Sequence, residues 1–395
     1  MPNSSVFYSF PYVFVFLITF FLTIPIVRYD KVELNMKLLF LFFIYFVFIG
    51  LRGYIFTDWK VYTILFDQTP RLFFDNFADI QDFLNSNFEK GFGLYNVLLK
   101  TIAPNWFIYQ AISFSVDFVL LYKFFERYIP KYILLGFLFF YIFDGLIIEI
   151  NLLRNSKAII IFLLSLKFID NKNIFKYFLM ILLATMFHVT SVIFFPLYFL
   201  LNKKINKKII LFLFFIGNFI FLFKIRWVTN ILVGMLGFID GRLASLIEGY
   251  TKSEMWSSSY GITIGYIERT FSFILIYIFK DKLLKLDNRN NIFINIAYLY
   301  FFSFLFFSEM SIFTDRIPIL FSSSYWILYP QIYSLITKKN KYLFIFCLLL
   351  YGVLKLFVGT KTILCVYDNV INLTYDKMER IKMNKKYLDY IGVKL

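Results

Sequence analysis

Long apolar runs recur along the whole chain and are separated by short polar gaps. Most runs hold enough consecutive apolar residues to cross the roughly 30 Å hydrocarbon core of a bilayer as an α-helix. The pattern therefore predicts an all-α, polytopic integral membrane protein with about 10–13 transmembrane helices in a single domain, 1–395. The predicted spans lie near 6–27, 36–51, 105–122, 132–150, 154–169, 209–227, 260–279, 292–307, 317–336 and 342–358.

The charges in the gaps predict the topology. The positive-inside rule places the gaps that are rich in lysine and arginine in the cytoplasm. The gap 52–90 is acidic and is predicted to be an external loop, and 228–259 is external by alternation. Alternation also puts the basic tail 359–395 outside, whereas its charge favours the inside, so its side stays open. The basic gaps are 28–37, 123–131, 170–176, 202–208, 280–290 and 337–341.

Segment 174–201 lies between two of these basic gaps, so both of its ends are predicted to be cytoplasmic. The segment would then enter the membrane and return as two short helices that meet near His188. About 28 residues allow two passes of roughly 20 Å each at 1.5 Å per residue. The alternative is one long tilted helix with His188 inside it.

Composition agrees with a membrane protein and excludes several other classes. Of the residues, 60% are hydrophobic and 57 are Phe, which no soluble domain of this length tolerates. The net charge of +16 sits in the gaps between spans, so it does not indicate nucleic-acid binding. Cys347 and Cys365 have no metal or redox spacing, and the chain holds one histidine, which makes a zinc site very unlikely. No cofactor is predicted, because neither a P-loop nor a dinucleotide fingerprint is present.

Ionisable residues at or inside the membrane are costly, and those away from a snorkelling end are candidates for function. Several arginines gathered on the outer side would suit a diphosphate, since the planar guanidinium binds phosphate oxygens in a fork. Simpler roles remain open: an interface anchor for Arg316, packing for His188, and an intramembrane polar network for Asp117, Asp144, Glu268, Arg269 and Lys355. The outer-side set is Arg52, Asp58, Glu89, Glu149, Arg154, His188, Glu309, Asp315 and Arg316.

Five stretches in order resemble the EpsG-like, Wzy-type polysaccharide polymerases. "GLRGYIFTDWKVYTILF" (50–66) is similar to the G-x-R…T-D-x-x-Y-x-x-x-F element of that family, and "FEKGFGLYNVLLK" (88–100) to its E-x-G-[FY]-x-x-x-N element. "LRNSKAIIIFLLSLKFI" (153–169) resembles the R-Q-x-x-A helix, with Asn155 in place of Gln and Lys157 at a usually small or apolar position. "LLATMFHVTSVIFFPLYFL" and "DRIPILFSSSYWILYPQI" resemble the A-x-x-F-H helix and a late arginine span.

The resemblance implies a GT-C-like membrane glycosyltransferase at the outer face of the bacterial inner membrane. Such a polymerase transfers a glycan from undecaprenyl diphosphate onto another lipid-linked repeat unit, in the synthesis of O-antigen, exopolysaccharide or capsule. It also implies membrane lipid, a flippase and a chain-length regulator as partners, and no nucleic acid. In this role, His188, Asp58 or Glu89 accepts the proton of the acceptor hydroxyl. The diphosphate is bound by Arg52, Arg154, Arg316 and Tyr62.

Two other functions remain open. A lipid-linked oligosaccharide flippase shares the substrate, but transporters usually carry internal repeats and charges distributed through a central cavity. Here the candidate charges gather on one side, which favours an enzyme. An O-antigen ligase shares the donor but tends to have a large late external loop, and 228–259 is of moderate length.

Overall fold

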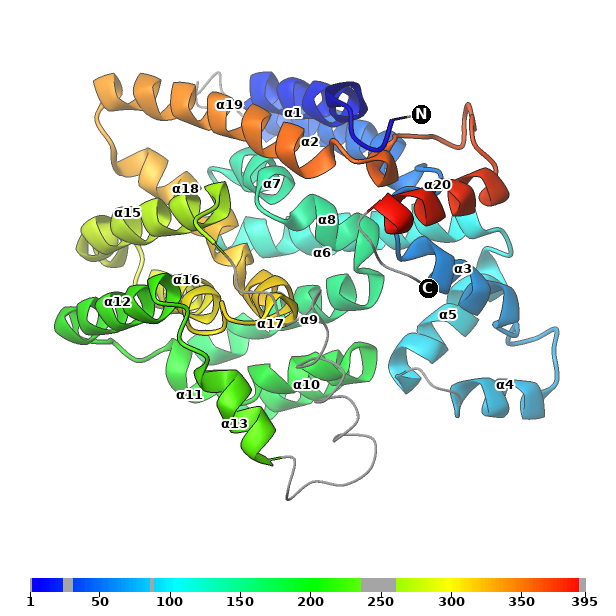
Figure 1. Ribbon diagram of the computed structural model, residues 1–395, viewed down its shortest axis with the longest axis horizontal. Coiled ribbons are helices and arrows are strands. Elements are labelled where there is room, and N and C mark those ends of the chain that lie inside the picture. Colours follow the sequence, from blue (N-terminus) through cyan, green and yellow to red (C-terminus); the bar gives the residue numbers. More distant parts are fainter. Residues whose placement is uncertain (1, 24–30, 86–88, 236–260, 391–395) are drawn as a thin grey trace. The chain divides into compact units, whose positions relative to one another are not determined.

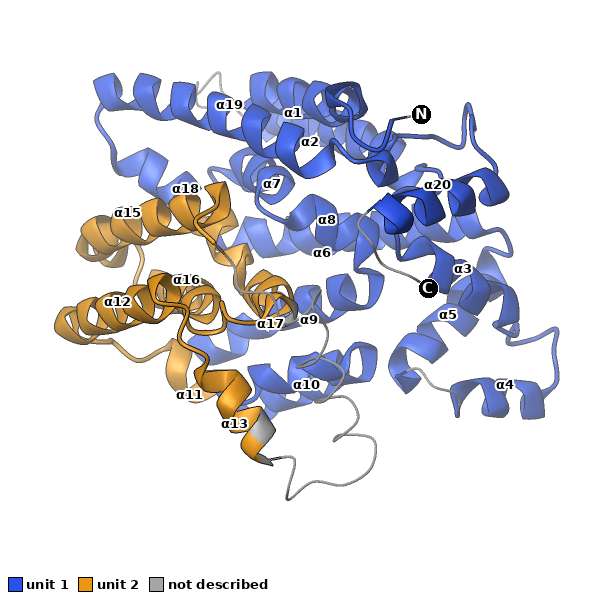
Figure 2. Cartoon of the chain, viewed as in Figure 1, with its two compact units in different colours: residues 1–196, 329–395 blue, residues 197–328 orange. Residues whose placement is uncertain are grey.

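The computed structural model describes residues 2–23, 31–85, 89–235 and 261–390. The chain divides into two compact units, residues 1–196 with 329–395, and residues 197–328 (Figure 2). Each unit is built from helices, and the described residues contain isolated β-bridges but no strand (Figure 1). The all-α class predicted from the apolar runs is therefore confirmed.

The first unit contains the N-terminal helices and the C-terminal tail. Its α-helices are α1 (Phe10–Thr23), α2 (Lys31–Tyr45), α3 (Trp59–Gln68), α4 (Phe77–Leu84), α5 (Lys90–Ile102), α6 (Trp106–Tyr128), α7 (Ile133–Ile142), α8 (Gly145–Asn151), α9 (Leu153–Asp170), α10 (Ile174–Phe187), α19 (Lys338–Thr360) and α20 (Lys377–Tyr390). Its shorter helical pieces are η1 (Val6–Ser9), the π-helical η2 (Phe46–Gly50), η3 (Val189–Phe194) and η5 (Ile363–Cys365).

The second unit is smaller, and α18 (Ser323–Leu335) runs from it into the first. Its other elements are α11 (Leu197–Leu201), α12 (Lys207–Leu222), α13 (Trp227–Met235), α15 (Ile264–Leu286), α16 (Asn290–Phe306), α17 (Ser311–Arg316) and η4 (Pro318–Phe321). Most of the predicted external loop 228–259 lies outside the described residues, as do 24–30 at the end of the first predicted span.

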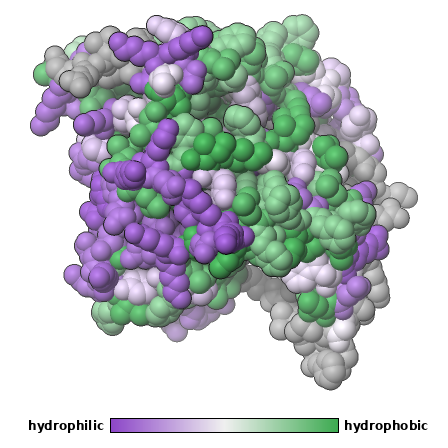
Figure 3. Space-filling model, turned by 90° about the vertical axis from the view of Figure 1, so that its left-hand side faces the viewer, coloured by the Kyte–Doolittle hydropathy of each residue, from purple (hydrophilic) through white to green (hydrophobic). Residues whose placement is uncertain are grey.

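Within the described residues, four helical segments are long and apolar enough to cross a membrane: Val6–Thr23, Lys31–Gly50, Trp106–Tyr128 and Lys338–Thr360. The bent pair α7 and α8, which meet at 67°, makes a fifth if it is one span. Fewer helices pass this test than the 10–13 predicted, because the other runs fold as shorter, broken or charged helices. Apolar side chains cover broad areas of the face in Figure 3, beside a hydrophilic patch, as expected for a polytopic membrane protein.

Three of the basic gaps meet at the C-terminal end of α6. Arg127 pairs with Asp170 at 3.4 Å, and the Tyr128 hydroxyl donates to the same carboxylate at 3.1 Å. Gln331, just before the gap 337–341, donates to the Tyr128 carbonyl at 3.4 Å. The gaps 123–131, 170–176 and 337–341 therefore share one end of this unit, as the positive-inside assignment requires.

Two further basic gaps lie together in the second unit. Lys207 pairs with Asp281 at 2.5 Å, and the Lys280 ammonium donates to the Ile205 carbonyl at 2.7 Å. The gaps 202–208 and 280–290 thus lie on the same side of that unit, again as predicted.

The chain reverses at His188. α10 ends at Phe187, His188 is extended (φ −154°, ψ 123°), and η3 follows. The Tyr177 hydroxyl donates to the Phe194 carbonyl at 2.7 Å, so η3 packs back against α10. The predicted reversal is confirmed and the single long helix is wrong, although the returning limb begins as a 3-10 helix because only six residues separate the turn from Phe195–Pro196.

The tail returns to the opposite end of α6, where the loop after η2 lies. We call residues 361–376 the C-terminal strap. Its Asp368 and Leu364 carbonyls accept from the amides of Gly53 and Phe56, each at 2.9 Å. Beyond the strap, Lys377 pairs with Asp67 at 3.3 Å. The tail therefore lies on the same side as the loop 52–90, which agrees with the alternation of spans.

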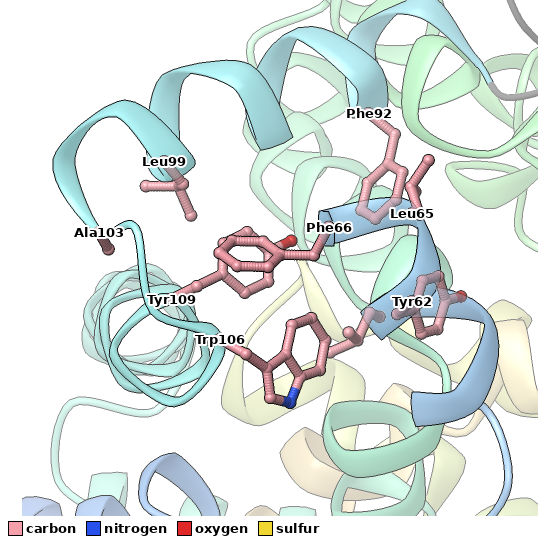
Figure 4. Packing of buried hydrophobic residues seen from close by; sticks show 9 residues of the cluster. Tyr62, Leu65, Phe66, Phe92, Leu99, Ala103, Trp106 and Tyr109 are labelled. Atoms are coloured by element: carbon pink, nitrogen blue, oxygen red, sulfur yellow. The ribbon is translucent and has the colours of Figure 1, made fainter. Parts of the chain in front are cut away.

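An aromatic cluster fills the space between α3, α5 and α6 (Figure 4). Phe66 packs against Trp106 and Tyr109, with ring centroids 5.6 and 5.2 Å apart. Tyr62 of α3 and Leu153 of α9 belong to the same cluster. Because the cluster is buried, it fixes the ends of the helices that carry the candidate site.

Candidate functional site

An ion pair joins two of the predicted site residues. Arg154, in the first turn of α9, donates to Glu89 Oε2 at 2.7 Å. Glu89 precedes α5, and its Oε1 accepts from the Val189 amide at 3.1 Å, one residue beyond His188. Both side chains are partly exposed, 28% for Arg154 and 17% for Glu89. One carboxylate thus ties α5 to α9 and to the turn that carries His188.

A glycine makes this approach possible. A Cβ added at Gly91 would lie 2.6 Å from Met186 Cβ and 2.8 Å from the Met186 carbonyl oxygen. The first turn of α5 therefore touches the last turn of α10 directly, and any side chain at position 91 would push them apart. This contact gives a structural reason for the glycine two residues after Glu89.

The surroundings of Glu89 keep it ionised. Partial burial of Glu89 opposes ionisation, but hydrogen bonds from its own and the Val189 amide and the charge of Arg154 outweigh burial and lower the pKa of the Glu89 carboxyl. Tyr62 is also hydrogen-bonded to Arg154. Burial raises the pKa of the Tyr62 hydroxyl, the Asp58 charge adds to the rise, and hydrogen bonding to Arg154 opposes it.

Asp58 is held by a neighbouring asparagine. Asn151 Oδ1, at the end of α8, accepts from the amides of Thr57 and Asp58 at 3.1 and 3.0 Å and from the Thr57 hydroxyl at 3.3 Å. The Thr57 hydroxyl also lies 3.1 Å from Asp58 Oδ1. Asp58 is half-buried at the start of α3, one turn before Tyr62.

The His188 ring is turned toward its own segment. Nδ1 accepts from the Thr190 amide at 3.2 Å and lies 2.8 Å from the Thr190 hydroxyl. Because a backbone N–H can only donate, Nδ1 carries no proton and the neutral ring has its proton on Nε2. In this arrangement Nε2–H is a hydrogen-bond donor. If His188 acted as a base, the proton would have to go to Nδ1, which already accepts from the Thr190 amide.

Arg52 lies deeper than the other candidates. Its guanidinium is 3% exposed and donates to the carbonyls of Ile49 at 2.7 Å and Ile150 at 3.3 Å. Burial lowers the pKa of Arg52 to about 10, against the opposing charge of Glu149, so the group is charged at neutral pH. Contact between Arg52 and a diphosphate stays a prediction.

A polar network lies behind the site, between α6, α8 and α9. Lys157 pairs with Asp117, and the Ser156 hydroxyl lies 2.7 Å from Glu149 Oε2 and 3.3 Å from Asp117 Oδ2. Together with Arg52, the network holds two basic and two acidic side chains, each nearly out of contact with solvent. Sequence reasoning placed Asp117 in such a network but missed its partner Lys157.

The candidates in the second unit have their own surroundings. Glu309 Oε1 accepts from the Val228 amide and, at 3.3 Å, from the Thr229 amide, so Glu309 caps the first turn of α13. Arg316 is exposed at the end of α17. Arg269 stacks on Phe304 and Tyr300, with its guanidinium 4.4 and 4.9 Å from the ring centroids. A gathering of Arg316 with Arg154 stays a prediction.

The first unit therefore brings together motifs that are far apart in the sequence. Glu89, Arg154 and the His188 turn are joined by direct contacts, and Tyr62 links Arg154 to Asp58. Sequence reasoning missed Asn151, which lies between Glu149 and Arg154 in the chain but has no periodic pattern that points to its role. The arrangement offers carboxylates, a cation and an imidazole N–H at one end of the membrane-spanning helices, which suits transfer chemistry on an anionic substrate.

Comparison with known proteins agrees with this arrangement. Neither the curated proteins nor the solved structures gave a match. The model of the EpsG family matches residues 35–374, which is nearly the whole chain and includes all the motifs at the site. The protein belongs to the EpsG family, a family of Wzy-like polymerases.

Proposed function

We propose that this protein is a polysaccharide polymerase of the bacterial inner membrane. It transfers a growing glycan from undecaprenyl diphosphate onto the non-reducing-end sugar of another lipid-linked repeat unit at the outer face. The observation that carries the proposal is the Glu89–Arg154 pair at the His188 turn, because it puts an arginine from a family motif at the end of the bundle opposite the basic gaps.

The chemistry requires three events at one place. The acceptor hydroxyl loses its proton, its oxygen forms a bond to the anomeric carbon, and the bond from that carbon to the diphosphate oxygen breaks. The proton needs an acceptor, and the leaving diphosphate needs positive charge and donors in a poorly solvated site. The polyprenyl tail stays in the bilayer, which keeps the reaction at membrane level.

Arg154 is the group we assign to the diphosphate. Its guanidinium is partly exposed, contacts Glu89 and Tyr62, and has the planar, forked shape that suits phosphate oxygens. Glu89 has both oxygens engaged and a lowered pKa, so it suits holding Arg154 better than taking a proton.

Asp58 is the group we assign as the proton acceptor. It is half-buried beside Tyr62, and it follows Thr57 in the T-D motif of the family. His188 presents Nε2–H and is assigned to donate a hydrogen bond to the substrate. Tyr62 extends the donor set next to Arg154.

The same proposal names partners by their chemistry. A flippase must deliver the lipid-linked repeat unit to the outer face, and a chain-length regulator would act on the growing product. Membrane lipid surrounds the spans. The polymer, whether O-antigen, exopolysaccharide or capsule, depends on the repeat unit supplied.

The test is chain extension by the purified protein in detergent, with lipid-linked repeat units as the sole substrate. Products longer than one repeat unit are expected, with release of undecaprenyl diphosphate. A flippase would need a sealed vesicle and would leave the repeat units unjoined. A ligase would join glycan to lipid A core, so adding that acceptor tells the two enzymes apart. No extension with repeat units from the native host would contradict the proposal.

A further inference from the structure

The segment that carries Asp58 has an unusual means of support. Asp58 occupies the cap position of α3 in a helical conformation (φ −74°, ψ −19°), and its side chain makes no capping hydrogen bond. The amides of Thr57 and Asp58 instead donate to a side chain from another helix, Asn151. A third donor, the Thr57 hydroxyl, reaches the same oxygen. One amide oxygen from α8 therefore holds the two residues that lead into α3.

The other flank of this loop is held by the C-terminal strap. The strap accepts from the amides of Gly53 and Phe56, and Val370 donates to the Leu51 carbonyl at 2.9 Å. Phe56 has a left-handed backbone (φ 64°), which costs a bulky residue free energy and persists only where neighbours enforce it. The strap thus fixes the loop up to Phe56, and Asn151 fixes the two residues that follow.

Asn151 also lies beside the group that holds Glu89. It is the last residue of α8, and Arg154 lies three residues later in the first turn of α9, after a break at Leu152 (φ −114°, ψ 54°). One short segment therefore contacts the Asp58 loop through Asn151 and the Glu89 loop through Arg154. The spacing between Asp58 and Arg154 is set by this segment.

We propose that Asn151 is a positioning residue that fixes the carboxylate of Asp58 relative to the guanidinium of Arg154. This inference rests on the proposed function, in which Asp58 takes the proton and Arg154 holds the leaving diphosphate. A misplacement of about 1 Å between reacting groups can cost roughly 10²-fold in rate. The neutral amide suits this role, because it accepts from the backbone without adding negative charge beside Asp58.

Two variants separate positioning from general structure. Asn151→Ala removes the acceptor and is expected to lower turnover roughly 10²-fold while donor binding is retained. Asn151→Asp keeps an acceptor oxygen but puts a second carboxylate beside Asp58, which raises the pKa of Asp58. Tyr62 on α3, itself hydrogen-bonded to Arg154 on α9, is an ionisable group that also interacts with Asp58. The acidic limb of the pH–activity curve should therefore move to higher pH in Asn151→Asp.

The matched control is Asn173→Ala. Asn173 Oδ1 accepts from the Lys176 amide at 3.0 Å at the start of α10, so this variant also loses a side-chain acceptor for a backbone amide. It should keep wild-type turnover and pH dependence. Equal losses in Asn173→Ala and Asn151→Ala, or an unmoved acidic limb in Asn151→Asp, would overturn the inference.

Hydrogen exchange of the amides of Thr57 and Asp58 gives a readout that does not depend on activity. Exchange is expected to be faster in Asn151→Ala and close to wild type in Asn151→Asp. If the Thr57 and Asp58 amides exchange as slowly in Asn151→Ala as in wild type, the inference is contradicted, and this holds for any activity of the protein. If the wild type extends no chains, the proposed function fails and the loss of protection still reports whether Asn151 holds the loop. Should Asn151→Ala not fold, the shift of the acidic limb in Asn151→Asp still tests the inference.

Discussion

The Glu89 carboxylate connects the start of α5 to α9 and to the turn at His188. Its protonation should therefore weaken the contacts among all three segments. The folded pKa of Glu89 is lowered, which means that its contribution to stability is present above its unfolded pKa near 4.5 and is lost as pH falls through the lower folded value. Glu89→Gln should unfold at a lower temperature than wild type at pH 7, and the difference should shrink as pH falls below about 4.5. Thermal unfolding in detergent at a series of pH values measures both. An equal difference at pH 7 and pH 3.5 would mean that the charge is irrelevant.

Arg154 should be sensitive to the shape of the cation as well as to its charge. We expect Arg154→Ala to abolish polymer formation and leave single repeat units on the outer surface. Arg154→Lys should also be poor, because a point charge cannot serve Glu89 and a diphosphate with a planar fork. Polymer length on gels from cells that carry each variant measures this. Normal chain length in Arg154→Lys would reduce Arg154 to a general positive charge.

For His188, two substitutions distinguish a donor from a base. The amide of Gln can place an N–H near Nε2, whereas Asn reproduces the acceptor at Nδ1 that Thr190 uses. If Nε2–H binds the substrate, His188→Gln should keep more activity than His188→Asn. Chain extension across pH 5.5–8.5, with donor binding measured separately, makes the comparison. Turnover that is at least roughly 10²-fold slower in His188→Gln with intact binding would instead identify His188 as the general base.

For single residues, the sequence predicted which side chains belong to the candidate site better than it predicted which side chains contact one another. The motifs pointed to Asp58, Glu89, Arg154 and His188, and Glu89 directly contacts Arg154 and the residue that follows His188. Asn151 could not be identified as their support, because a side chain's partners across 90 residues leave no periodic signal. For the same reason, no partner could be predicted for Lys157 in its apolar helix, whereas the structure pairs it with Asp117.

Between elements, the contact of α5 with α10 depends on Gly91. Gly91→Ala puts a methyl group within 2.6 Å of Met186 Cβ, so the helices must separate, at a cost of about 1–3 kcal/mol. The movement should also break the bond from the Val189 amide to Glu89 and lower activity. Thermal unfolding and chain extension measure the two effects. Gly359→Ala in α19 is the control, because its Cβ meets nothing within 4 Å and it should not destabilise the protein.

Element boundaries were harder to predict than element type. The run 132–150 was expected to be one span, but it folds as α7 and α8 with a sharp bend. The bend lies at Asp144, which has a left-handed backbone (φ 63°) and is paired with Lys355 at 3.5 Å. An Asp-Gly pair is a turn signal. The apolar residues around it hid this signal, because a hydropathy pattern reports burial in lipid and says little about where a helix bends.

For the whole molecule, the sides of the membrane can be tested with single cysteines. In a background with Cys347→Ser, cysteines at Asn173 and Asn206 should resist an impermeant thiol reagent applied from outside, because both lie in basic gaps. Cysteines at Phe73 and Ile371, which are 82% and 73% exposed, should both be labelled. Labelling of one of the first pair would contradict the prediction that both ends of segment 174–201 are cytoplasmic. Labelling of Phe73 without Ile371 would contradict the contact between the tail and the loop 52–90.

At this largest scale, the sequence predicted the class of the fold and, within each unit, the grouping of five of the basic gaps, since both follow from hydropathy and charge alone. The division into two units was not foreseen, because it depends on which helices pack together. The side of the tail was undecided for a physical reason. Its basic charge favours one answer, and the Asp67–Lys377 pair together with the backbone bonds of the strap favours the other.

The strap also has a consequence for how the protein is made. The loop that leads to Asp58 leaves the ribosome long before the residues that hold its near flank, 364–370. The strap also reaches the N-terminus, where the Ser5 amide donates to the Lys361 carbonyl at 2.8 Å. The spans can therefore insert in order during synthesis, while the loop is held only after the strap has been made. A chain that stops before residue 364 would occupy the membrane with this flank of Asp58 unsupported.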